Sequence, residues 1–253
     1  MAEQILKNAK IFIAGYDLSG DANEVTLSQN VELQDRTVFN SSFRKRKPGL
    51  KSVELSGGGF WNSSEGVKGT TRGRIDPVAF ERLGTTGNVM SVLPNGASLG
   101  SVVYVAPSII AEYSPGGSIG DMFGYNITAN GQESLGRGVL LREGLASSKA
   151  STAFNIGVDT TNRKIVTGIH VLESSGASGG SISVIIQAST VIGFTGTPKK
   201  LYSAAITTGI VGGSVWCSTK NPTTSYSYVR AKTSQNGTSD KKFKVVVTVG
   251  YQK

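Results

Sequence analysis

The chain has 253 residues, of which 38% are hydrophobic and 17% charged, a composition typical of a folded protein with a sizeable core. No segment approaches the roughly 18 apolar residues of a membrane-spanning helix. The start lacks the basic and apolar regions of a signal peptide, so we expect neither a membrane protein nor a secreted one. One cysteine and one histidine exclude an intramolecular disulfide framework and the usual zinc sites, so we expect no metal and no cofactor.

Charge is divided unevenly along the chain. Residues 1–134 contain 12 Lys/Arg and 13 Asp/Glu, a net charge of −1, whereas the remaining residues contain 14 and 4, a net charge of +10. This asymmetry predicts two modules, 1–140 and 141–253, that face different surroundings. Apart from Arg44–Lys47, Lys199–Lys200 and Lys241–Lys244, the cations are scattered, and they accompany no recognisable nucleic-acid-binding motif. A basic face that meets an acidic protein, or simple solubility, therefore explains them better than direct nucleic-acid binding.

Alternation of apolar and polar residues predicts strands through most of the first module. The first two lie at residues 25–33 and 52–56. Between them, the basic cluster Arg44–Lys47 is predicted to lie in a hairpin loop that ends at the turn signal Pro48-Gly49. Residues 63–74 have no periodicity and are predicted to form a flexible loop.

One short helix and many further strands follow. Asp76 as the N-cap and Pro77 at the first helical position predict a helix that ends near Leu83. Further strands are predicted at residues 102–106, 109–113, 123–129, 165–172, 182–186, 199–205, 211–217, 225–233 and 243–249. Turns are predicted at 114–117 and 236–237, and a linker near 146–153. These signals predict an all-β fold of antiparallel β-sandwiches in two modules, with one short flanking helix.

Few residues suit catalysis. His170 has the opposite parity to the apolar residues of its predicted strand, which indicates a polar, outward-facing position. Cys217 follows Trp216 in an apolar strand, where free cysteine behaves as a small buried hydrophobe. The glycine runs lack the Gly-Lys-Ser/Thr of a phosphate-binding loop. We therefore expect no catalytic residue and no enzyme, unless the fold brings His170 and Cys217 together in a cleft.

Several segments of the first module resemble the major tail (tail tube) proteins of long-tailed bacteriophages. The resemblance covers about residues 5–135 and is a pattern of short motifs. The matching segments are Gly20–Leu27, Val31–Phe39, Gly49–Gly57 and Gly120–Gly131. The helix predicted near 76–83 matches the helix that flanks the tube-forming sheets of that family.

The resemblance implies a structural virion protein, made in the host cytoplasm, that forms homo-oligomeric rings, hexameric in the family. Stacked rings would form a tail tube through which DNA passes, with other tail proteins as partners. Sheets that continue between subunits would cover exposed strand edges. The near-neutral first module would then form the wall, and the basic second module would lie outside, away from the phosphates of passing DNA.

Candidate inter-subunit contacts follow from this interpretation. They are the basic residues Arg44, Lys45, Arg46 and Lys47, the aromatic pair Phe60 and Trp61, and Arg72 and Arg74 of the flexible loop. A solvated loop is the alternative reading of the basic cluster.

Two other functions stay open. A capsid head decoration protein would explain the basic half equally well, because it would sit on an acidic capsid. A carbohydrate- or receptor-binding module would need an exposed aromatic platform, for which the candidates are Phe60, Trp61, Trp216, Tyr226 and Tyr228. Trp216 is predicted to pack in a core instead, because its strand is apolar.

Overall fold

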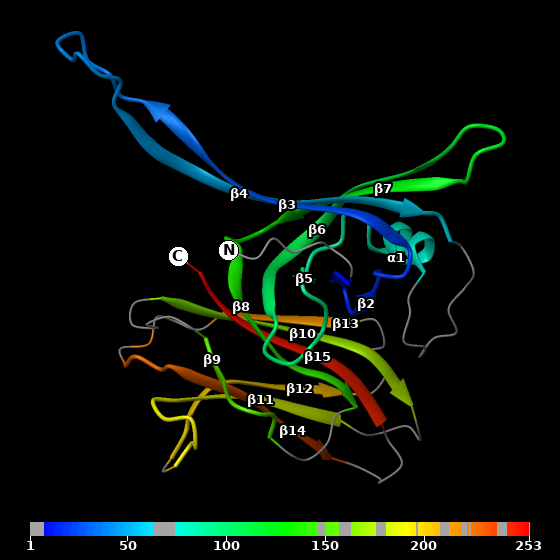
Figure 1. Cartoon of the computed structure of the whole chain (residues 1–253), viewed down its shortest axis with the longest axis vertical. Helices are drawn as coiled ribbons and strands as arrows, with labels where there is room; N and C mark the ends of the chain where they lie inside the picture. The colour runs from blue at the N-terminus through cyan, green and yellow to red at the C-terminus, as the bar shows by residue number, and fades with distance from the viewer. Residues whose placement is uncertain are drawn as a thin grey trace.

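The chain folds almost entirely into antiparallel strands (Figure 1). The structure is a computed structural model that describes residues 8–62, 74–145, 150–156, 163–175, 181–195, 197–207, 213–218, 222, 224–236 and 242–252. One helix, α1 (Ile75–Arg82), lies within these ranges. The predicted all-β class with one short helix is confirmed. No helix in the described ranges is long and apolar enough to cross a membrane.

The described strands form two sheets. The strands are β1 (Lys10–Ile13), β2 (Tyr16–Asp17), β3 (Ala22–Asp35), β4 (Arg46–Phe60), β5 (Asn88–Leu93), β6 (Val102–Gly116), β7 (Gly124–Gly131), β8 (Gly136–Leu145), β9 (Phe154–Asn155), β10 (Lys164–Ser175), β11 (Ser181–Ser189), β12 (Lys199–Thr207), β13 (Gly213–Ser218), β14 (Tyr228–Asn236) and β15 (Lys242–Gln252). Eleven strands form one sheet along the path β13-β10-β15-β8-β6-β5-β1-β2, with β7 beside β6, β4 beside β7, and β3 beside β4. The other four form the second sheet in the order β12-β11-β14-β9.

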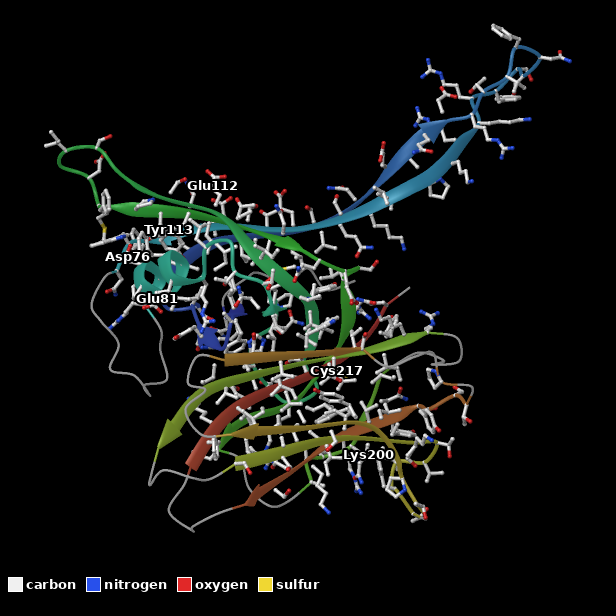
Figure 2. All side chains as sticks on the ribbon, turned by 180° about the vertical axis from the view of Figure 1, so that it is seen from behind. Asp76, Glu81, Glu112, Tyr113, Lys200 and Cys217 are labelled. Carbon is white, nitrogen blue, oxygen red and sulfur yellow. The ribbon has the colours of Figure 1, made fainter. Side chains whose placement is uncertain are left out.

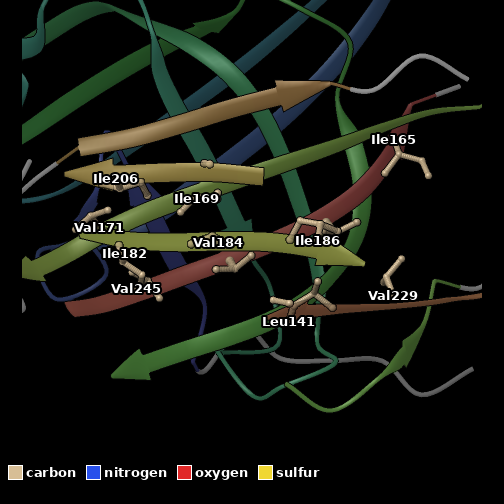
Figure 3. Packing of buried hydrophobic residues seen from close by; sticks show 14 of the residues in the cluster. Leu141, Ile165, Ile169, Val171, Ile182, Val184, Ile186, Ile206, Val229 and Val245 are labelled. Atoms are coloured by element: carbon tan, nitrogen blue, oxygen red, sulfur yellow. The ribbon is translucent and has the colours of Figure 1, made fainter. Parts of the chain in front are cut away.

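The second half of the chain is a sandwich with a well-filled core. The inner face of β12-β11-β14 packs against β10, β15 and β8 (Figure 3). Ile169, Ile186 and Val247 lie in this core and are fully buried. Each such side chain contributes about 1.5–3 kcal/mol on burial. Strict alternation along β11 produces this arrangement, because its even-numbered residues from Ile182 to Ala188 all point inward.

The first half has its own core beneath the β3-β4-β7-β6 part of the large sheet. Val53 and Leu55 of β4 and Ile127 of β7 point into it, and Val78 of α1 packs from below. The glycines at the end of β4 allow close backbone approach. An added Cβ on Gly59 would lie 1.9 Å from the carbonyl oxygen of Asp21.

A continuous sheet joins the two halves. β8 pairs with β6 on one side and with β15 on the other, so the predicted module boundary at residue 140 falls inside a strand. The division into two modules stays a prediction. Residues 146–149 of the predicted linker lie outside the described residues.

The prediction that His170 faces solvent is wrong. Its side chain is fully buried, because the face of β10 that turns away from the sandwich core is covered by the first half of the chain. The imidazole lies near Phe12, and its Nε2 is 2.8 Å from Ser91 Oγ on β5. β10 is therefore buried on both faces.

Three local predictions are also wrong. Pro48-Gly49 is not a turn but lies inside β4, where Pro48 pairs with Leu33. Among the described strands, β3 is the one neighbour of β4 in that segment, and an edge position of this kind tolerates proline. Asp76 does not cap α1, which begins at Ile75 and has no side-chain cap. The turn predicted at 114–117 starts later, because β6 runs as one strand to Gly116.

Candidate assembly surfaces

The most prominent feature is a two-stranded arm that leaves the body of the molecule (Figure 1). We define the arm as residues 31–51, which comprise the outer parts of β3 and β4 and their connection. The pairing of β4 with β7 stops at Glu54, so among the described strands the arm is paired only within itself. It is exposed along both faces. An isolated ribbon of this kind gains no core burial of its own.

Local hydrogen bonds shape the arm tip, defined as residues 36–47. The Asp35 carboxylate accepts hydrogen bonds from the hydroxyl and the backbone N–H of Thr37, and these bonds lower the pKa of Asp35. Thr37 Oγ1 accepts in turn from the N–H of Lys45, at 3.1 Å. Across the tip, the N–H of Arg36 donates to the carbonyl of Lys45 at 2.7 Å. The tip is therefore ordered without packing on the body.

The arm tip combines exposed apolar and cationic side chains. Phe39 is fully exposed, and Phe43 and Val38 are 81% and 60% exposed. The same segment contains five cations: Arg36, Arg44, Lys45, Arg46 and Lys47. Arg46 and Lys47 lie on β4 rather than in the loop, which corrects the sequence-based placement of the cluster. Large apolar side chains exposed together in one short segment make the arm tip a candidate interaction surface.

The sheet at the base of the arm has a polar outer face. The register places Thr26 opposite Ser56, Glu54 opposite Asn130, and Glu112 opposite Thr128. This outer face comprises Glu24, Thr26, Ser28, Asn30, Ser52, Glu54, Ser56, Gly58, Glu112, Ser114, Asn126, Thr128, Asn130 and, at one end, Phe60. It carries three carboxylates and no Lys or Arg among these positions. Figure 2 shows Glu112 on this side of the sheet and Tyr113 on the other.

A polar contact holds α1 beneath the inner face. Asp76 Oδ1 accepts hydrogen bonds from Tyr113 OH at 2.8 Å and from Trp61 Nε1 at 3.1 Å. Burial, together with the Asp76 carboxylate, raises the pKa of Tyr113, so the phenol stays a donor. Asp76 thus acts as a tertiary acceptor in the first turn, where the helix dipole also favours an anion.

A second apolar patch lies at the opposite end of the same sheet from the arm (Figure 1). We define this hairpin end as the β6–β7 connection, residues 117–123, together with Phe60 and Trp61. Ile119 is fully exposed and Met122 is 73% exposed. Trp61 packs edge-on against Phe123, with ring centroids 5.4 Å apart. Phe60, which pairs with Gly124, is half exposed.

The predicted contact residues therefore fall into two groups. Arg44–Lys47 lie at the arm tip, and Phe60 and Trp61 lie at the hairpin end. Arg74 is 3.9 Å from the Asp21 carboxylate, and Arg72 lies outside the described residues, as does most of the 63–74 loop. Sequence reasoning missed Phe43, Ile119 and Met122. Their signal was an apolar side chain placed among turn residues, where no strand periodicity explains it.

The residues considered for catalysis are kept apart. Cys217 pairs with Thr167 and contacts Tyr202 of the facing sheet, whereas His170 lies on the other face of β10. Burial raises the pKa of the Cys217 thiol and lowers that of His170 to about 3. Trp216 packs against Val89, Val105 and Val166, as predicted. No group of three or more potential metal ligands occurs within the described ranges.

No protein-family model matches the sequence, and no curated protein matches it. Among solved structures, a chain in the virion of a native gene transfer agent is 20% identical, with a TM-score of 0.39, over 53% of this chain and 97% of that one. The Dit protein of SPP1, described as a paradigm of the hub adsorption apparatus in phages that infect Gram-positive bacteria, is 12% identical, with a TM-score of 0.40, over 98% of this chain and 100% of that one. A chain of the sheath–tube complex of an extracellular contractile injection system is 9% identical, with a TM-score of 0.38, over 54% and 92%. These values are low, so the function is inferred from this chain's own geometry.

Proposed function

We propose that this protein is a non-enzymatic structural subunit of a phage tail. Its copies form rings around a channel, and the rings stack to build the tail tube. The outer face of β3-β4-β7-β6 lines the channel, and the sandwich of the second half lies outside. The observation that carries this proposal is the chemistry of that outer face, which is polar, acidic and without cations at the positions named above.

Such a face suits the wall of a channel for DNA. Duplex DNA carries about one negative charge per 1.7 Å of its axis, and cations on a wall would bind its phosphates and slow its passage. The hydroxyl, amide and carboxylate groups of the outer face offer no such binding sites. The charge distribution fits the same arrangement, because residues 135–253 carry the net charge of +10 and the described strands β9 to β15 lie away from this face (Figure 1).

A second function, capsid decoration, is favoured by one observation. The basic second half would be attracted to an acidic capsid surface. A decoration protein has no need of a cation-free face or of an arm that projects from the far side of the molecule. Tail assembly therefore accounts for more of the structure.

The experiment is electron microscopy of the purified protein with site-specific gold labels. In a Cys217→Ser background, Glu112→Cys labelled with maleimide gold should place gold inside the channel of each ring. Lys200→Cys, on the exposed edge of β12, is the matched control and should place gold on the outside (Figure 2). Native mass spectrometry of the same samples gives the number of subunits.

Two results would contradict the proposal. Gold at Glu112 on the outer surface of the rings would show that another face lines the channel. A protein that stays monomeric at every concentration, and that binds purified capsids instead, would establish decoration in its place.

A further inference from the structure

The arm tip and the hairpin end are complementary in charge and alike in apolar character. The arm tip carries five cations around Val38, Phe39 and Phe43. At the hairpin end, residues 117–123 contain the acid Asp121 and no Lys or Arg. At its turn the side chains of Ile119 and Met122 are exposed. The two surfaces therefore carry opposite charges, and both expose apolar side chains to solvent.

The two surfaces lie at opposite ends of one sheet and cannot meet within one molecule (Figure 1). We propose that the arm tip of each copy docks on the hairpin end of the next copy. This inference rests on the proposed ring assembly and names the two surfaces that form its subunit contact. The occupant of the hairpin end is thus a second copy of this chain.

Charge decides between this contact and the symmetric alternatives. An arm-to-arm contact would oppose five cations to five cations, and a contact between two hairpin ends would oppose Asp121 to Asp121. Like charges brought together at an interface are costly, whereas complementary patches steer encounter and fix the register. The contact is therefore heterologous, and a heterologous contact closes into a ring when its rotation divides a full turn.

Apolar contact supplies the part of the interaction that salt does not screen. Phe39 is the most exposed aromatic side chain of the tip and would meet Ile119 or Met122 of the neighbour. The ionic part should weaken as salt rises, because the Debye length falls from about 10 Å at 0.1 M to about 3 Å at 1 M. We expect assembly to be slower, and still to occur, at high salt.

Thiol cross-linking tests the contact. Phe39→Cys and Ile119→Cys are introduced together in the Cys217→Ser background, and the protein is treated with a short bismaleimide. The double variant should give a ladder of covalent oligomers that ends at the ring size. An equal mixture of the two single variants should give dimers that contain one of each chain. Phe39→Cys with Lys200→Cys is the matched control and should give no ladder.

The outcomes separate this inference from the proposed function. Rings without a ladder would overturn the contact and leave the ring function standing. Covalent dimers from Phe39→Cys alone would overturn it in favour of an arm-to-arm contact. A protein that forms no rings in any variant would overturn both.

Charge reversal gives a second, independent readout. Arg44→Glu with Lys45→Glu should weaken ring formation about tenfold or more, because attraction becomes repulsion. Adding Asp121→Lys to the same chain should restore part of it. If the three-residue variant assembles no better than the two-residue variant, the arm tip does not face the hairpin end, and the proposed contact is wrong.

Discussion

The arm and strand β10 are both long, and both carry several apolar residues, yet their surroundings are opposite. β10 is covered on one side by the sandwich core and on the other by the first half of the chain. The arm is exposed along both faces, and the side chains of Leu33, Val38 and Phe39 are exposed to solvent. An apolar residue in β10 is explained by this fold alone. An apolar residue in the arm has no such explanation in the described fold, and our proposal gives it a partner on a second copy.

The largest effect should come from a cavity in β10. Ile169→Ala should lower the free energy of unfolding by about 2–5 kcal/mol, because it removes buried methyl groups and leaves a void in a close-packed core. Leu33→Ala removes similar groups from the arm and should cost less than about 0.5 kcal/mol. Urea denaturation of both variants measures the difference. Equal losses would mean that the arm is packed on the body in solution.

A pH dependence should come from the other face of β10. His170 has a pKa of about 3 in the folded chain, because burial disfavours its charged form, against an ordinary value of about 6.5. Above pH 6.5 both states are neutral. As the pH falls toward 3 only the unfolded chain binds the proton, so stability is lost progressively. The loss should reach about 2 kcal/mol by pH 5.

The control for this pH effect is His170→Gln, which cannot titrate. Urea midpoints of the native protein should fall between pH 7 and pH 5, and those of His170→Gln should fall much less. Parallel curves for the two proteins would show that imidazole burial does not cause the acid loss.

The same comparison explains how much of the fold could be predicted from sequence. Strands with one face toward solvent show regular alternation, so β11 was predicted within a few residues. β15 was predicted as closely, because its sequence alternates at Phe243, Val245 and Val247 even though Val246 and Thr248 are also buried. β5 was not predicted, because Asn88–Leu93 is buried on both faces and shows no alternation. The same double burial defeated the parity argument for His170. Both β5 and His170 are buried by tertiary packing, which the alternation of residues along one strand does not report.

The candidate surfaces were predictable in part. The basic cluster was visible as a charge run, and Phe60-Trp61 as an aromatic pair after three glycines. Their location at opposite ends of one sheet was not, because it depends on β4 pairing with both β3 and β7. The role of Asp76 as a hydrogen-bond acceptor could not be predicted either, because its partner Tyr113 lies 37 residues away in the sequence.

A smaller effect on stability is expected where α1 packs beneath the β3-β4-β7-β6 part of the large sheet. Tyr113→Phe removes the hydrogen bond to Asp76 and leaves that acceptor with Trp61, so it should cost about 1 kcal/mol. Glu112→Gln, one residue away on the outer face, should stay within about 0.5 kcal/mol. Denaturation of the two variants checks this. A larger loss of unfolding free energy for Glu112→Gln would show that the outer face contributes to the stability of the fold.

The smallest effect on stability should be the most informative about function. Phe39→Ser removes an aromatic side chain that is fully exposed, so the free energy of unfolding should change by less than about 0.5 kcal/mol. Assembly into protein rings, measured by sedimentation, should nevertheless weaken about tenfold, because the phenyl group no longer contacts the hairpin end of the next copy. Ile192→Ser, 63% exposed on the sandwich, is the control and should leave assembly unchanged. A residue that folding ignores and assembly requires can belong only to an interface, and equal behaviour of the two variants would remove Phe39 from it.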